Sequence, residues 1–216
     1  MNQRCILLYF LICLSFSLMA QEEESTTPFK KDLWLTSLEG TISSSNSTLG
    51  NSNSQQFNTT YGFDISSNKL FKDRWAAGLR LTATRSASSS FIDRESESIF
   101  LGPSISHFFS DNPQGSLFLE FSPGYVRFFE SSEANIGLGI VEEVVDGNGF
   151  GTIIRFGYAH VINEKVVFNF GMNITNFWIL ADRTSEPGPT TVSENLSIGS
   201  LAFSFGFSVL LEKFFF

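Results

Sequence analysis

The segment that decides the fold lies near the end of the chain and reads Leu201-Ala202-Phe203-Ser204-Phe205-Gly206-Phe207-Ser208-Val209-Leu210-Leu211. From Leu201 onward every second side chain is bulky and apolar. The side chains between them, up to Ser208, are small. A period of two is that of a β-strand, because successive side chains point to opposite faces. The segment therefore predicts a strand with one bulky apolar face and one small face.

Seven earlier segments alternate in a similar way. They are residues 33–42, 59–66, 75–85, 97–108, 116–128, 149–159 and 166–180. Most of them reach the roughly 9 to 11 residues that a tilted membrane strand needs. We expect long connections at 43–58, 86–96, 129–148 and 181–195, and short turns at 67–74, 109–115 and 160–165. Alternating long and short connections are typical of outer-membrane barrels.

The residue types on the two faces indicate which face meets lipid. The non-apolar face consists mainly of Gly, Ser, Thr and Asn, which suits a narrow interior, whereas the Phe and Leu face suits hydrocarbon. Five aromatic residues lie near expected strand ends, as in an aromatic girdle. They are Tyr61, Trp75, Phe128, Tyr158 and Trp178. A secreted, soluble, ligand-binding β-barrel would place the bulky face inside, and it remains the alternative.

Composition restricts the function classes. The chain has 216 residues and a net charge of −8, and 17 % of its residues are charged, compared with about 25 % in soluble domains. Nucleic-acid binding needs clustered Lys and Arg, and no such cluster exists in the sequence. We therefore expect no nucleic-acid partner.

The first 20 residues have the pattern of a signal peptide. Arg4 precedes an apolar run at 5–14, and Ala20 is a plausible cleavage point. Residues 21–32 form a polar leader that we expect to be periplasmic and mobile. Both cysteines lie in the signal segment, so the mature chain would have none. No later run reaches about 18 apolar residues, so membrane insertion must use strands.

Residues 33–216 resemble the small eight-stranded outer-membrane barrels of the OmpA/OmpX-like porin superfamily. The resemblance rests on the alternating strands, the turn region 68–78, the Leu101-Gly102-Pro103 segment and the Phe-rich end. It implies a closed, antiparallel, up-and-down, transmembrane β-barrel in the cell outer membrane with both termini periplasmic. Its partners would be outer-membrane lipids and the barrel-assembly machinery, with Phe216 as the assembly signal. The alternation breaks at Glu212-Lys213, which leaves the end of the last strand open.

Five charged residues are expected to point into the lumen as a polar network: Glu39, Asp64, Arg80, Glu120 and Arg155. One interpretation is a salt-bridge gate in a narrow conduit. The other is simple pairing, because a barrel interior cannot hold unpaired charge. Eight strands leave an interior about filled by side chains, which favours pairing.

We expect no catalytic residue, cofactor or metal site. A lipid-modifying barrel enzyme would need a His-x-Ser arrangement at the outer rim, but His107 and His160 precede apolar residues at the opposite end. Residues 146–151 lack the spacing of a phosphate-binding loop.

The long connections are the expected functional surface. Residues 129–146 mix acidic and apolar residues, and we consider either a solvated loop or strands extended outward with an edge that pairs with an extracellular protein. The sequence thus predicts a non-catalytic outer-membrane barrel with a structural, surface-interaction or narrow-pore role. The alternatives are a lipid-modifying enzyme and a secreted soluble barrel.

Overall fold

The computed structural model describes residues 27–48, 55–89, 92–135, 140–186 and 190–213. Its elements are β1 (Trp34–Thr48), β2 (Gln55–Lys72), β3 (Trp75–Ser89), β4 (Ile92–Phe108), β5 (Gly115–Asn135), β6 (Ile140–Val161), β7 (Val166–Glu186) and β8 (Thr190–Leu211). Each strand covers all or nearly all of the alternating segment that predicted it. Within the described part of the chain, no helix is long and apolar enough to cross a membrane.

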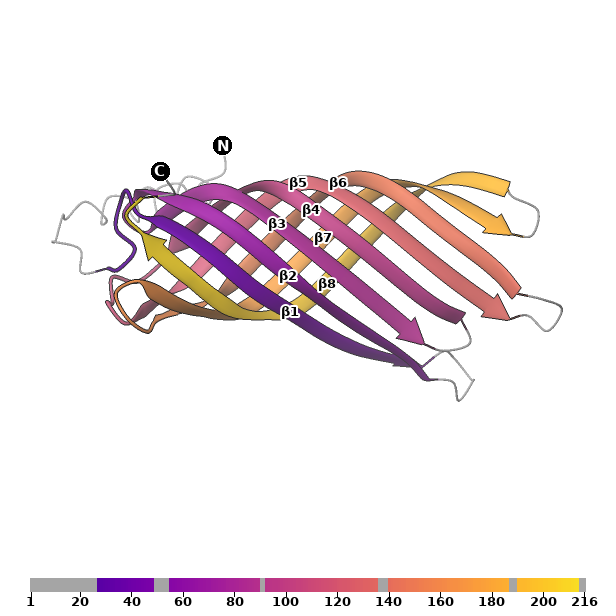
Figure 1. Cartoon of the computed structure of the whole chain (residues 1–216), viewed down its shortest axis with the longest axis horizontal. Coiled ribbons are helices and arrows are strands. Elements are labelled where there is room, and N and C mark those ends of the chain that lie inside the picture. Colours follow the sequence, from indigo (N-terminus) through magenta and orange to yellow (C-terminus); the bar gives the residue numbers. More distant parts are fainter. Residues whose placement is uncertain (1–26, 49–54, 90–91, 136–139, 187–189, 214–216) are drawn as a thin grey trace, which may run out of the picture.

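The strands close into one barrel in chain order, and β8 pairs back to β1 (Figure 1). All neighbouring strands are antiparallel. The final strand therefore pairs with both the seventh strand and the first, as a closed barrel requires. The expected closed, up-and-down, eight-stranded barrel is confirmed.

The two ends of the barrel differ, and we name them by the strands that begin or finish there. At the terminal end β1 begins and β8 finishes, with Trp34 opposite Leu211. The connections at this end are residues 73–74, 109–114 and 162–165. The opposite end, where β1 turns toward β2 and β7 toward β8, is the distal end. Figure 1 draws the terminal end at the left and the distal end at the right.

The distal strands run further than expected. For example, β5 continues to Asn135 and β6 begins at Ile140, inside the expected connection 129–148. The expected extents of the long connections 43–58, 86–96, 129–148 and 181–195 are therefore wrong. These segments carry polar residues on both faces, so they lack a clear period of two. Backbone pairing with an antiparallel neighbour does not depend on that period, and it extends the strands.

One part of the barrel wall is open at the distal end. The hairpin of β5 and β6 is paired on both sides, with β4 as far as Ile92 and with β7 as far as Glu186. The interpretation of residues 129–146 as a free pairing edge is therefore wrong. In contrast, β1 and β8 pair only as far as Ile42 and Phe203, beyond which β8 continues against β7 alone. We call this unpaired stretch between β1 and β8 the seam.

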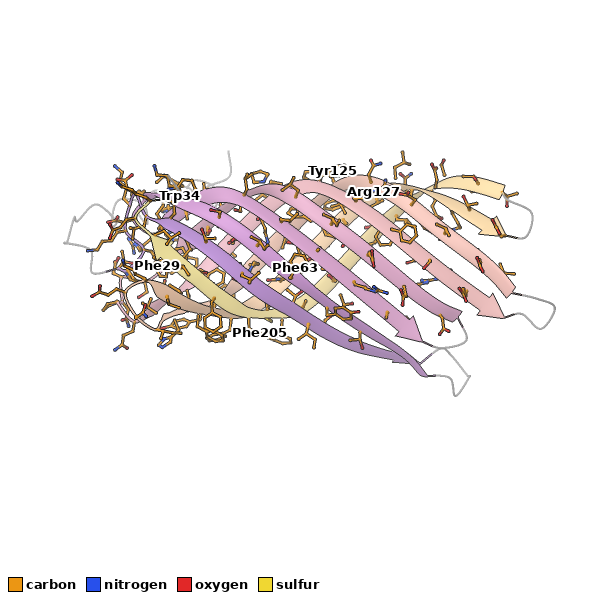
Figure 2. All side chains as sticks on the ribbon, viewed as in Figure 1. Phe29, Trp34, Phe63, Tyr125, Arg127 and Phe205 are labelled. Carbon is orange, nitrogen blue, oxygen red and sulfur yellow. The ribbon has the colours of Figure 1, made fainter. Side chains whose placement is uncertain are left out.

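The outer face of the barrel is apolar. On β8, Phe203 is 63 % exposed and Phe205 is 55 % exposed, and every strand carries at least two exposed large apolar side chains. Figure 2 shows Phe63 and Phe205 on the outside of the ribbon. A continuous apolar surface of this kind suits a hydrocarbon environment and does not fit a soluble barrel.

The expected leader enters the terminal mouth of the barrel. Phe29 is fully buried, and its ring stacks on Phe108 with centroids 3.8 Å apart. The Arg74 amide donates a hydrogen bond of 2.8 Å to the Phe29 carbonyl, and the Asp32 amide donates one of 2.7 Å to the Leu70 carbonyl. For residues 27–32 the expectation of a mobile leader is therefore wrong. The expected signal segment 1–20 and residues 21–26 lie outside the described residues.

Candidate functional site

Five charged side chains from five strands meet in the lumen, and we call them the charge layer. They are Glu39 on β1, Asp64 on β2, Arg80 on β3, Glu120 on β5 and Arg155 on β6. Each is at most 4 % exposed. The sheet register brings them together, because Glu39 lies opposite Asp64 and Glu120 lies opposite Arg155. The structure thus gathers all five of the lumen residues that the sequence singled out.

Two guanidinium groups hold three carboxylates in the charge layer. Arg80 Nε lies 2.6 Å from Asp64 Oδ2, and its Nη1 lies 2.8 Å from Glu120 Oε1. Arg155 pairs with Glu39 across the lumen, and its Nη1 lies 3.7 Å from Glu120 Oε2. Like charges opposite each other on neighbouring strands repel. The carboxylates on β1 and β2 avoid this cost because each has its own arginine.

Polar neighbours satisfy part of the remaining hydrogen-bonding capacity. Asn169 Nδ2 donates to Glu39 Oε1 over 3.0 Å, and Thr82 Oγ1 donates to Asp64 Oδ2. Buried ion pairs need such additional hydrogen bonds to offset the cost of desolvation. Asp64 Oδ1 and Arg80 Nη2 are buried without a hydrogen-bond partner among the described residues. The layer is therefore densely but not completely bonded.

On the terminal side of the charge layer, apolar side chains close the lumen, and we call them the plug. They are Phe29, Leu35, Leu70, Ala76, Phe108, Phe118, Ala159, Val167 and Leu210. Arg155 Cζ lies 5.1 Å from the Phe118 ring centroid, so the charge layer rests on the plug. The cavity between the two has a volume of about 10 Å³, which is room for about one water molecule.

On the distal side of the charge layer, the lumen holds a cavity of about 280 Å³. Ten hydroxyl-bearing residues line it, and we call them the hydroxyl wall: Thr41, Ser43, Thr60, Thr82, Thr84, Ser86, Ser96, Ser98, Thr175 and Ser200. Several of them bond to each other. Thr84 Oγ1 and Ser98 Oγ are 2.7 Å apart, and Thr60 donates to Ser86 over 3.0 Å. A hydroxyl group can donate one hydrogen bond and accept up to two.

The same cavity has an apolar wall formed by Phe128, Ile153, Phe177 and Ile198. The first three belong to a buried cluster that extends toward the distal end. Its other members are Phe100, Val126, Val145, Ile179 and Ala181. The cavity is therefore amphipathic, with its hydroxyl groups mainly on β1 to β4 and its apolar groups on β5 to β8.

Arg183 on β7 forms a clasp near the distal end of the lumen. Its Nη1 lies 2.7 Å from Glu143 Oε2 on β6, and its Nη2 lies 2.8 Å from Glu194 Oε1 on β8. The hydrogen bond with Glu194 raises the pKa of Arg183 above its ordinary value, and the pairing outweighs the opposing effect of burial. The guanidinium therefore stays charged and ties three strands together.

The two histidines lie at the terminal end of the barrel. His107 on β4 faces Trp75, with ring centroids 4.2 Å apart, and His160 on β6 pairs with Gly115. No group of three or more His, Cys, Asp or Glu residues that could hold a metal ion occurs in the described part of the chain.

Sequence reasoning missed Phe29 and the amphipathic cavity. The signal for Phe29 was a single apolar aromatic residue in an otherwise polar leader. For the cavity, the sequence signal was the high proportion of Ser and Thr at inward-facing strand positions on the distal side of the charged residues. Phe216, the expected assembly signal, lies outside the described residues.

Comparison with known proteins identifies the fold. No family model and no curated protein matches the chain. The outer membrane protein OprG from Pseudomonas aeruginosa superposes with a TM-score of 0.58 at 12 % identity, over 87 % of this chain and 99 % of that one. A major outer membrane protein from Thermus thermophilus gives 0.55 at 9 % identity, over 83 % and 99 %. At these identities the likeness establishes a shared fold, the outer-membrane β-barrel.

Proposed function

We propose that this chain is an integral outer-membrane protein that neither catalyses a reaction nor conducts solutes, and that it acts through the surface at its distal end. The observation that carries this proposal is the double closure of the lumen by the plug and the charge layer. A conducting pore needs a continuous aqueous path, whereas the pocket found between these two layers has room for about one water molecule.

The outer surface supports membrane integration. Outward-facing apolar side chains occur on every strand, and the fold is that of outer-membrane barrels. Extraction of membranes with alkaline carbonate should leave the protein in the pellet. The folded protein should also migrate faster on an SDS gel before boiling than after it. Release by carbonate would contradict integration.

The terminal end faces the periplasm in this proposal. Short turns are periplasmic in outer-membrane barrels, and an even number of strands returns both ends of the chain to one side. Asn112→Cys in a terminal turn and Thr191→Cys at the distal end form a matched pair of single-cysteine variants. A membrane-impermeant maleimide should label only Thr191→Cys on intact cells. Labelling of only Asn112→Cys would reverse the orientation.

Single-channel recording in planar bilayers tests the closure. We expect no conductance steps from the wild-type protein. The Phe29→Ala/Phe108→Ala variant removes two rings of the plug, and Arg155→Ala removes one arginine of the charge layer. Because the two layers act in series, steps should appear only when all three substitutions are combined.

Phe71→Ala/Phe109→Ala, which removes two rings that are each 50 % exposed, controls for general loosening of the terminal end. Regular conductance steps from the wild type would overturn the proposal. Steps from Arg155→Ala alone would instead support the salt-bridge gate that the sequence left open.

A further inference from the structure

We infer that the amphipathic cavity is a binding site for one neutral, polyhydroxylated ring, such as a monosaccharide unit with its apolar ring face against the apolar wall. This goes beyond the proposed function, which requires only that the lumen be closed beneath the cavity. The argument rests on the polarity, the charge, the size and the position of the cavity.

The polarity of the cavity matches a molecule with two unlike faces. The hydroxyl wall comes mainly from β1 to β4, whereas the apolar wall comes from β5 to β8. Phe128 and Phe177 are 5 % and 6 % exposed, so the apolar wall is held in place by the distal cluster. A sugar ring presents hydroxyl groups at its edge and C–H groups on its face. Hydroxyl groups can both donate to and accept from such an edge.

The charges around the cavity favour a neutral ligand. Among the described residues, no Lys or Arg lines the cavity, and the charged residues that do are Glu97 and Glu130. Each of these already pairs with an arginine at 3.4 Å, Glu97 with Arg85 and Glu130 with Arg94. An anionic ligand would therefore meet no unpaired cation and would lose its hydration without compensation.

The size and the floor of the cavity limit the ligand to one ring. Its volume of about 280 Å³ is at the lower limit of small-molecule sites, which span roughly 300 to 1,000 Å³. Thr82 lines the cavity and donates to Asp64 of the charge layer, and Asn173, another lining residue, accepts from Ser204. The floor is thus part of a bonded network that a longer ligand could not enter.

The seam gives the site polar groups that an ordinary barrel wall lacks. Ser43 on β1, and Ser200 and Ala202 on β8, line the cavity on the two sides of the seam. The backbone pairing between β1 and β8 ends at Ile42 and Phe203. Backbone N–H and C=O groups that face the seam beyond this point therefore have no partner strand in the described part of the chain, and strong hydrogen-bonding groups of this kind favour a polar ligand.

Binding can be measured by isothermal titration calorimetry on the folded full-length protein in a zwitterionic detergent, because glycoside detergents would compete. The probes are methyl β-D-glucopyranoside, glucuronate and cyclohexylmethanol. We expect the glucoside to bind at least tenfold more tightly than either of the others. Glucuronate adds a charge, and cyclohexylmethanol leaves the hydroxyl wall without partners.

Variants locate the site. Ala202→Phe fills the cavity and should abolish glucoside binding, whereas Ala83→Phe, the same change on the outer face of β3, should leave it unchanged. Thr84→Val should weaken binding several-fold. Heat-modifiable migration on SDS gels verifies that each variant is folded.

Three results would overturn the inference: no glucoside binding to the wild type, equal binding of cyclohexylmethanol, or undiminished binding to folded Ala202→Phe. Because conductance depends on the plug and the charge layer, none of these results would alter the outcome expected for the proposed function.

Discussion

The lumen is built differently in its two halves. In the terminal half, buried apolar side chains pack against a charge layer, and the pocket between them has room for about one water molecule. In the distal half, the same eight strands enclose a cavity of about 280 Å³ between hydroxyl groups and apolar side chains. A narrow barrel can therefore be closed at one end and hollow at the other without any change in strand number. The side chains that point inward determine which of the two occurs.

The two halves of the lumen also use polar residues in different ways. In the terminal half, opposite charges are buried and bonded to each other, so the loss of one partner leaves an uncompensated charge. In the distal half, neutral hydroxyl groups share weak bonds, so each can be lost at small cost. The substitutions below test this difference.

The largest effect is expected for Arg155→Met. It leaves Glu39 without its guanidinium partner, and removing one member of a buried pair costs about 3–5 kcal/mol. Equilibrium unfolding in urea, monitored by gel migration, should show this loss. The matched control is Arg127→Met, whose pair with Asp146 has side chains 49 % and 46 % exposed. The control should change the free energy of unfolding by less than about 1 kcal/mol. Equal losses would contradict the assigned role of the charge layer.

A somewhat smaller effect is expected for Phe29→Ala. The substitution removes the ring that stacks on Phe108, and truncating a buried Phe costs about 3 kcal/mol. Because Phe29 lies outside the strands, the loss should appear as local opening. Amide hydrogen exchange at Arg74, whose N–H bonds to the Phe29 carbonyl, should accelerate. Exchange that is unchanged would show that the segment does not depend on this ring.

Gly206→Ala should cost about 1–3 kcal/mol through overpacking. A Cβ at Gly206 would clash with the Leu38 carbonyl oxygen and lie 2.6 Å from Glu39 Cγ, so the β1 backbone and the Glu39 side chain would both have to shift. Gly40→Ala is the control, because its nearest neighbour, the Phe205 carbonyl oxygen, would be 4.0 Å away. Urea unfolding of the two variants should differ. If both behave alike, β1 and β8 pack more loosely around Glu39 than the contacts indicate.

The smallest effect is expected for Thr84→Val. It removes one hydroxyl from the pair with Ser98 and should cost about 1 kcal/mol or less. The same unfolding assay gives the measurement. A loss as large as that of Arg155→Met would mean that the hydroxyl wall is a bonded network like the charge layer.

The architecture and the charge layer could be predicted because both follow from a period of two. Once Asp64 and Arg80 are assigned to the small face of their strands, a closed barrel must place them inside. The partners across the lumen could not be predicted. The bond between Arg155 and Glu39 joins β6 to β1, and it depends on barrel diameter and register.

The distal strands and Phe29 could not be predicted for a different reason. Segments such as 129–148 are polar on both faces, so only the neighbouring strand reveals that they pair. Phe29 lies in a segment without periodicity, and its place depends on the tertiary contact with Phe108.

The length of the strands sets how far the protein stands above the lipid. β6 has 22 residues, which at about 3.3 Å per residue gives roughly 70 Å of strand. With a tilt near 45°, this corresponds to about 50 Å of height, against an apolar band about 25 Å tall. The difference of about 25 Å lies beyond the apolar band on this side of the barrel, whereas β1, with 15 residues, gives only about 35 Å of height on the other side of the seam. In the proposed orientation, with the distal end outward, this uneven wall would leave the β1 side as the shorter route for molecules that approach the cavity from outside the cell.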